Sequence, residues 1–338
     1  MGRTESVLIL GGSGQAGAGT AALLREWHPD LPLTIAGRDL GRAQRVADEV
    51  GNATAVTVDL ERTDLGLPEG SEHSAVVAAL WDSRLHGLGY AQDRGLPYLS
   101  LSSGLVDIAP EVVLGAQRAG AAPMLLASHW CAGVITVAAL ELAREFERVD
   151  AVRVGAMLDE SDTGGPAGIA DLERWGEVTS AGLVRRDGAF RWIDGPDADV
   201  DLVLSDGRTL PARSIAVLDV PGVALATGAR DVGFAFAVGE SAGRRRGGGP
   251  SVEARIDLEG VGPGGEPLRT SHYLVHAEGQ RPLTALGIAL GVERLIGLRG
   301  EAVVPGIHTP EGLIDPAYAA KRLAEIGAVF VEAEPVTG

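Results

Sequence analysis

Three glycines spaced for phosphate binding stand near the start of the chain, at Gly12, Gly14 and Gly17. They follow the apolar run 6–10 and precede an alanine- and leucine-rich stretch ending near Trp27, so they join a predicted strand to a predicted helix. The first glycine permits a tight turn, the second lets backbone N–H groups approach a pyrophosphate, and the third lets helix and strand pack closely. The helix dipole also favours an anion here. We therefore expect a dinucleotide, the alternative being a turn without a ligand; the expected contacts are Gly12, Ser13, Gly14, Gln15, Ala16 and Gly17.

The residues after the second predicted strand, 33–36, indicate which dinucleotide binds. Gly37 and Arg38 follow this strand, whereas a site that prefers NAD usually has an acidic residue there for the ribose 2′-hydroxyl. The Arg38 guanidinium suits a 2′-phosphate, and Arg42 adds a second positive charge one turn into the next helix. Against this, Asp39 can reach a 2′-hydroxyl, and both arginines can be solvated surface residues. We expect NADP(H).

Further cofactor contacts are expected where other strands end, because ligands of parallel sheets bind outside the carboxyl ends of the strands. Asp59 follows the third predicted strand. The fourth predicted strand delivers Ala79 and Leu80 to the ribose and nicotinamide side of the cofactor. Trp81 and Trp130 can form walls of the nicotinamide pocket, or they can simply pack in the core.

Hydride chemistry also needs a proton, and three residues near the same edge have suitable side chains. His129, after the sixth predicted strand, exchanges a proton near neutral pH and is the first candidate; its alternative role is a hydrogen bond to a neighbouring loop. Asp82 can orient a substrate ammonium or act as the acid, or it can cap a helix. Cys131 can be a nucleophile beside a histidine base, as in semialdehyde dehydrogenases, or an inert buried thiol.

The order of predicted elements indicates the fold class. Strands and helices alternate over the first 130 residues, which predicts an α/β fold with a doubly wound parallel Rossmann sheet. Hairpin turns follow at 186–188, 205–207 and 262–265, so the second domain is α+β on a largely antiparallel sheet. A helix over 282–295, a helix over 317–326 and a strand over 328–332 complete the chain. We expect a dinucleotide-binding domain of residues 1–131 plus about 300–338, and a substrate and dimerisation domain of residues 132–299.

Composition excludes several classes of protein. The net charge of −17 and the aromatic content of 4% disfavour nucleic acid and anionic membranes as partners. No apolar run approaches the ~20 residues of a membrane span. The N-terminus has no basic-then-apolar leader, so we expect a cytoplasmic protein. The single cysteine rules out a cysteine-rich zinc site, and we expect no metal.

Two charged segments of the second domain each allow more than one interpretation. Asp159, Glu160 and Asp162 precede Thr163–Pro166; this acidic loop can face a cationic amine, act as a lid with glycine hinges or be merely solvated. Arg244–Arg246 precede three glycines, which predicts a disordered surface turn; the alternative is a clamp for a carboxylate or phosphate.

Several pieces in order along the chain resemble the saccharopine dehydrogenase family, taken broadly to include saccharopine reductases, carboxynorspermidine dehydrogenases and lysine dehydrogenase-like enzymes. The matching pieces are Val7–Gly17, Ile35–Arg38, Val76–Leu80, Gly95–Ser100, Ala119–Gly120, Gly133, Val304–Gly306 and Glu325–Gly327. Two positions depart from the family's pattern. Ser100 stands near a common acid, and Cys131-Ala132-Gly133 replace a frequent Asp-Pro-Gly.

The resemblance implies a two-domain NADP(H)-dependent oxidoreductase, often a homodimer, whose second domain supplies the pocket for a small-molecule substrate. It implies hydride transfer at a carbon bonded to nitrogen: reduction of an imine, or the reverse, on a small amine or amino-acid-like substrate. His129 would then supply the proton to nitrogen. Two alternatives stay open: NADP(H)-dependent reduction of an activated alkene, ketone or semialdehyde, and an NADP sensor without turnover.

Overall fold

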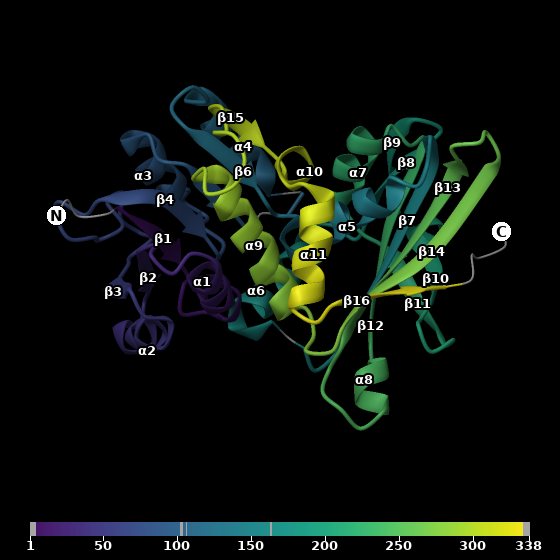
Figure 1. Ribbon diagram of the computed structural model, residues 1–338, viewed down its shortest axis with the longest axis horizontal. Coiled ribbons are helices and arrows are strands. Elements are labelled where there is room, and N and C mark those ends of the chain that lie inside the picture. Colours follow the sequence, from purple (N-terminus) through teal and green to yellow (C-terminus); the bar gives the residue numbers. More distant parts are fainter. Residues whose placement is uncertain (1–4, 102–103, 106, 163, 334–338) are drawn as a thin grey trace. The chain divides into compact units, whose positions relative to one another are not determined.

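The computed structural model describes residues 5–101, 104–105, 107–162 and 164–333. The chain divides into two compact units, each assembled from separate stretches of sequence (Figure 1). Unit 1 comprises Met1–Ser103, Asp107–Ser128 and Thr284–Leu313. Unit 2 comprises Gly104–Val106, His129–Leu283 and Ile314–Gly338.

Unit 1 contains a seven-stranded parallel sheet in the order β15-β6-β5-β4-β1-β2-β3. The order reverses beside β1, where a doubly wound fold binds its ligand. Strands β1 and β4 are buried along almost their whole length. Such continuous apolar runs are typical of a parallel sheet that helices cover on both faces. Its first six strands and their helices are β1 (Ser6–Leu10), α1 (Gln15–Trp27), β2 (Leu33–Gly37), α2 (Leu40–Val50), β3 (Ala53–Thr57), β4 (His73–Ala78), α3 (His86–Arg94), β5 (Tyr98–Ser100), α4 (Ile108–Gln117) and β6 (Pro123–Leu126).

A late segment returns to complete unit 1. It contains α9 (Arg281–Leu295), β15 (Gly306–His308) and α10 (Pro310–Leu313). Gly291 on α9 lies so close to the first sheet that a Cβ there would be 2.7 Å from Leu99 and from Leu125. Gly19 on α1 approaches Ala285 in the same way, at 2.8 Å. Small residues thus let α9 pack tightly against β5, β6 and α1.

Unit 2 contains a nine-stranded sheet whose main path is β10-β11-β12-β7-β13-β14-β16, with β8 and β9 attached at β12. Neighbouring strands are antiparallel except for β12 and β7, which run parallel. Figure 1 shows the long β7, β13 and β14 side by side. The strands are β7 (Arg148–Asp159), β8 (Gly182–Arg186), β9 (Ala189–Ile193), β10 (Asp199–Val203), β11 (Thr209–Ser214), β12 (Asp231–Gly239), β13 (Val252–Val261), β14 (Pro267–His276) and β16 (Val329–Glu332).

The helices of unit 2 include α5, which is buried along most of its length and packs against α7 and α11. Apart from Thr136, its buried residues are apolar, as expected of a helix covered on several sides. A short 3-10 turn, η1 (Trp130–Gly133), leads into it. The helices and the second 3-10 turn are α5 (Val134–Ala143), α6 (Gly165–Val178), η2 (Gly195–Ala198), α7 (Asp219–Thr227), α8 (Ala242–Arg245) and α11 (Pro316–Glu325).

The predicted hairpins are confirmed, and their turns explain why the sequence revealed them. β8 and β9 are joined at Asp187 (φ 51°) and Gly188 (φ 81°), a left-handed pair that matches the twist of a two-residue hairpin. β10 and β11 are joined around Gly207 (φ 81°). β13 and β14 form the third hairpin.

The domain boundaries differ from those predicted. The segment that returns to the first unit begins at Thr284, not near residue 300, and residues from Ile314 onward fall in unit 2. The reason is hydrogen bonding at a sheet edge: β16 pairs antiparallel with β14, which gives partners to backbone groups on both strands. The sequence shows a strand at 329–332 but not which sheet it joins.

Candidate functional site

The glycine turn between β1 and α1 has the tight geometry that a phosphate cradle requires. A Cβ on Gly17 would lie 2.5 Å from the Gly11 carbonyl oxygen, and one on Gly12 would lie 2.8 Å from the Ile9 carbonyl oxygen. Helix α1 begins after Gly14 with no side-chain cap and no acidic residue in its first turn. Its first N–H groups and the dipole are therefore suited to an anion, and Ser13, Gln15 and Ala16 line the same turn.

The end of β2 lies beside this turn. A Cβ on Gly37 would be 2.7 Å from the Ser13 hydroxyl oxygen. The Arg42 guanidinium donates a hydrogen bond to the Ser13 carbonyl (3.3 Å), so its charge lies at the glycine turn. Arg38 is exposed at the strand end. The Asp39 carboxylate accepts the Arg42 backbone N–H (3.0 Å) and caps α2, so it has a structural task beside the two arginines.

The end of β4 lies on the other side of the turn. The Ala79 N–H donates to the Leu10 carbonyl (3.0 Å), and the Leu80 side chain lies 3.1 Å from the Cβ position of Gly11. Both residues therefore border the glycine turn, and their contact with a cofactor stays a prediction. Trp81 is 41% exposed. Asp59 lies beyond β3, exposed, and its carboxylate accepts the Glu61 N–H (2.9 Å) in a local turn.

Asp82 serves the start of α3. Its carboxylate accepts the Gly87 N–H (2.7 Å) and the Arg84 N–H (3.2 Å), and the side chain is buried. These contacts agree with the alternative interpretation, in which Asp82 caps a helix by accepting backbone N–H groups at its start. Catalysis by Asp82 remains a prediction, and its two carboxylate oxygens already accept hydrogen bonds from the backbone.

His129 stands three residues after β6 ends and belongs to unit 2, where it precedes η1. It is buried, at 4% exposure. The turn after it has an unusual backbone: Cys131 (φ 50°, ψ 41°), Ala132 (φ 54°, ψ 34°) and Gly133 (φ 85°) are all left-handed. Only the last is a glycine, and left-handed residues with a Cβ cost roughly 1–2 kcal/mol each. Backbone strain of this kind often marks a functional site.

A residue that sequence reasoning missed holds this turn. Asp219, the first residue of α7, is buried and accepts the Trp130 N–H (2.8 Å) and the Thr136 hydroxyl (2.7 Å). Burial raises the pKa of its carboxyl, while the positive charge of His129 and these hydrogen bonds lower it. No local sequence motif predicts this role for Asp219, because an aspartate at the start of a helix is usually an exposed residue that interacts with the helix dipole.

Trp130 and Cys131 pack in the core of unit 2. The Trp130 ring meets Phe234 edge-on at 5.9 Å and Phe236 at 6.2 Å between centroids. This favours the packing interpretation of Trp130. Cys131 is 5% exposed.

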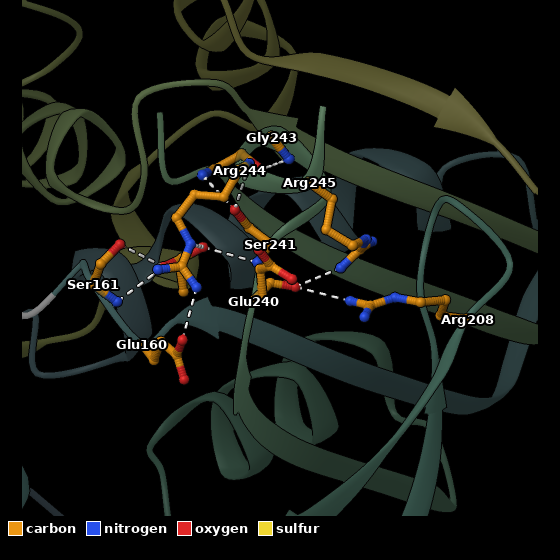
Figure 2. Close-up of polar contacts among 10 residues, drawn as sticks. Glu160, Ser161, Arg208, Glu240, Ser241, Gly243, Arg244 and Arg245 are labelled. Atoms are coloured by element: carbon orange, nitrogen blue, oxygen red, sulfur yellow. Dashed lines mark hydrogen bonds and ion pairs between the residues drawn. The ribbon is translucent and has the colours of Figure 1, made fainter. Parts of the chain in front are cut away.

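Asp159 and Glu160 of the acidic loop pair with Arg244 of the arginine segment, and Figure 2 shows the contacts of Glu160 and Arg244. The Asp159 carboxylate accepts hydrogen bonds from Ser161 N–H (2.8 Å) and Ser241 N–H (2.8 Å) and pairs with Arg244 Nε (3.1 Å). Arg244 also bonds Glu160 (2.7 Å; Figure 2). Arg245 donates to the Glu240 carbonyl (2.6 Å) and pairs with Asp206.

These contacts correct the expectation of a disordered turn at Arg244–Arg246. Ser241 caps the short helix α8 by accepting the Arg244 N–H, and carboxylates neutralise the first two arginines. The clamp interpretation is also disfavoured, because these two cations already have anionic partners. Thr163 of the acidic loop lies outside the described residues.

We searched the described residues for a metal site and for a membrane-spanning helix. These residues contain no group of three or more His, Cys, Asp or Glu side chains arranged to hold a metal ion. No helix among them has the length and apolarity to span a membrane.

Comparison with solved structures identifies the fold. Apo saccharopine dehydrogenase (L-Glu forming) from Saccharomyces cerevisiae is similar, with a TM-score of 0.67 at 12% identity over 98% of this chain and 99% of that chain. The chain has a saccharopine dehydrogenase-like fold. A scyllo-inositol dehydrogenase from Lactobacillus casei, solved with NAD(H) and scyllo-inositol, has a TM-score of 0.49 at 13% identity over 97% of this chain and 99% of that chain. No family model and no curated protein sequence matches. The expected resemblance is confirmed for the fold.

Proposed function

We propose that this protein is an NADP(H)-dependent oxidoreductase that transfers hydride at the C–N bond of a small amine or amino-acid-like substrate. The reaction is reduction of an imine or its reverse. The observation that carries the cofactor assignment is the Arg42 guanidinium at the Ser13 carbonyl, with Arg38 exposed at the end of β2. A guanidinium at the glycine turn, with a second arginine at the neighbouring strand end, suits a 2′-phosphate better than a 2′-hydroxyl.

The residues of unit 1 fit a dinucleotide. Gly12, Gly14 and Gly17 leave no side chain between the turn and the first N–H groups of α1, and these N–H groups would hold the pyrophosphate. Leu80 would border the ribose and nicotinamide side. The cofactor supplies hydride when bound; the protein must orient it and provide the proton.

His129 is the proposed proton donor. An imidazole exchanges protons near neutral pH, and reduction of an imine requires one proton at nitrogen as hydride reaches carbon. The choice of a C–N bond is supported by the motifs that resemble the saccharopine dehydrogenase family and by the shared fold. Because one fold can host several reactions, the substrate needs an experiment.

The cofactor test is a calorimetric titration of the wild type, Arg42→Ala and Arg38→Ala with NADPH and NADH. We expect the wild type to prefer NADPH, and each variant to lose NADPH affinity by about 10- to 100-fold, the effect of losing a hydrogen bond to a charged group. NADH affinity should change little. Arg45→Ala, an exposed arginine on the same helix, is the control. Equal affinity of the wild type for both nucleotides would contradict the NADP assignment.

The reaction test follows NADPH consumption with amines and carbonyl compounds supplied in pairs. We expect turnover only when both are present, because the imine forms from the two. His129→Ala should lower kcat by about 10²–10⁴-fold, the range of a general acid. Cys131→Ser should retain activity. The opposite pattern, with loss in Cys131→Ser alone, would favour semialdehyde chemistry, and absence of turnover with any pair would favour a sensor.

A further inference from the structure

The glycine turn is fastened to the end of β2 directly before Gly37. The Gly12 N–H donates a hydrogen bond to the Ala36 carbonyl (3.0 Å), which joins the turn to the last residues of the strand. A Cβ on Gly12 would also lie only 3.1 Å from the Ile35 side chain, so the turn and the strand are in close contact. The next residue of the turn, Ser13, is therefore held beside Gly37.

Gly37 leaves the space that the Ser13 hydroxyl occupies. A Cβ on Gly37 would lie 2.7 Å from the Ser13 hydroxyl oxygen, which is too close, but 3.7 Å from the Ser13 Cβ, which is an ordinary van der Waals contact. Gly37 does not have a left-handed backbone, so it is the space and not a special φ angle that requires glycine here. A side chain at residue 37 would thus conflict with the hydroxyl of Ser13 and with no other part of that residue.

The side chains around this space can all donate hydrogen bonds to an anion. Within the part of the chain that the structure describes, neither the Ser13 hydroxyl nor the Arg38 guanidinium has a hydrogen-bond or ion-pair partner. The Arg42 guanidinium donates one hydrogen bond, to the Ser13 carbonyl (3.3 Å). The carboxylate of Asp39 is engaged at the backbone N–H of Arg42, where it caps α2. Two guanidinium groups and a hydroxyl form a donor set that suits the oxygens of a phosphate.

We propose that the Ser13 hydroxyl is a ligand of the ribose 2′-phosphate, and that Gly37 is a specificity-determining residue because it leaves room for this hydroxyl. The proposal rests on the proposed function, in which the cofactor is NADP(H). The hydroxyl adds an uncharged donor of fixed position to the long and flexible side chains of Arg38 and Arg42. An acidic side chain at residue 37, as found near this strand end in sites that prefer NAD, would displace the hydroxyl and repel the phosphate.

The test is a calorimetric titration of the full-length protein with adenosine 2′,5′-bisphosphate and with AMP. These two probes differ only in the 2′-phosphate, and neither carries a nicotinamide. We expect the wild type to bind the bisphosphate at least tenfold more tightly than AMP. Ser13→Ala should lose about tenfold in affinity for the bisphosphate, the effect of losing a hydrogen bond to a charged group, and should bind AMP like the wild type. Unchanged bisphosphate affinity in Ser13→Ala would overturn the proposal.

A double variant tests the steric role of Gly37. Gly37→Ala should lose bisphosphate affinity to the same extent as Ser13→Ala, because the new methyl group displaces the hydroxyl. Two alanines fit side by side at 3.7 Å, so Ser13→Ala combined with Gly37→Ala should lose no more than either change alone. Losses that multiply in the double variant would overturn the role of Gly37. Gly89→Ala, on α3 with nothing within 4 Å of its Cβ position, is the control and should bind both probes like the wild type.

The outcomes separate this proposal from the proposed function. If Ser13→Ala weakens bisphosphate binding but no pair of amine and carbonyl compound is reduced, the proposed reaction fails while the phosphate site stands. If Arg38→Ala and Arg42→Ala weaken NADPH binding but Ser13→Ala does not, the proposed cofactor stands and the role of Ser13 fails.

Discussion

At the scale of single residues, two buried carboxylates of unit 2, Asp159 and Asp219, have pKa values shifted in opposite directions. Burial opposes ionisation of Asp159, but hydrogen bonds from Ser161 and Ser241 outweigh it and lower the pKa to about 2. In Asp219, burial prevails and raises the pKa. The difference follows from the donors: Asp159 receives three hydrogen bonds and an arginine, whereas Asp219 receives two hydrogen bonds in a more apolar setting.

This predicts an acid-dependent contribution of Asp159 to stability. Its pKa is about 2 folded against 3.8 for the free side chain, which corresponds to about 2 kcal/mol. A lowered carboxyl pKa stabilises the fold above pH 4, and the contribution is lost as pH falls from about 4 to 2. Asp159→Asn should therefore lower the urea midpoint at pH 7, and the gap to wild type should shrink toward pH 3. Glu160→Gln, at an exposed carboxylate, should change stability by less than about 0.5 kcal/mol. A gap that does not vary with pH would contradict the charge as its cause.

At the scale of elements, glycines in helices have opposite effects depending on their surroundings. Gly17 in α1 has no room for a Cβ, because the Gly11 carbonyl oxygen would be 2.5 Å away. Gly89 in α3 has nothing within 4 Å of its Cβ position. The first glycine lets the helix and the turn approach each other, while the second only adds freedom to the unfolded chain.

The same substitution should therefore change stability in opposite directions. Gly17→Ala should destabilise the protein by roughly 1–3 kcal/mol through overpacking and should weaken nucleotide binding. Gly89→Ala should stabilise it by about 0.5–1 kcal/mol, because alanine is the better helix former. Thermal denaturation followed by circular dichroism measures both. Destabilisation by Gly89→Ala would show that α3 has a contact there that the geometry does not contain.

At the scale of the whole molecule, each compact unit is completed by residues from a distant part of the chain. In unit 1, His28 after α1 bonds the buried carboxylate of Glu293 on α9 at 2.7 Å, across 265 residues of sequence. In unit 2, β16 completes the edge beside β14. Because of the His28–Glu293 contact, unit 1 depends on a segment that lies far from α1 along the chain.

His28→Ala should therefore destabilise unit 1 by about 1–3 kcal/mol, the cost of losing a partner to a buried acceptor. Glu26→Ala, at an exposed position on α1, is the control, and its free energy of unfolding should stay within about 0.5 kcal/mol of the wild-type value. Hydrogen exchange of the β1 and α9 amides localises the effect. Equal exchange in His28→Ala and wild type would mean that the His28–Glu293 contact does not contribute to holding α9 in unit 1.

The sequence by itself determined the parallel sheet, the glycine turn and the hairpins, because each depends on short-range patterns: apolar runs, glycine spacing and turn residues with left-handed backbone. It also indicated that Ala79 and Leu80 lie where β4 ends, since strand ends in a parallel sheet share one edge. Only the tertiary structure decided that 284–313 completes the first unit, that Arg244 pairs with Asp159, and that Asp219 holds the turn after His129. These depend on which distant groups meet once the apolar surfaces are buried, and no local pattern encodes the partner of a buried charge.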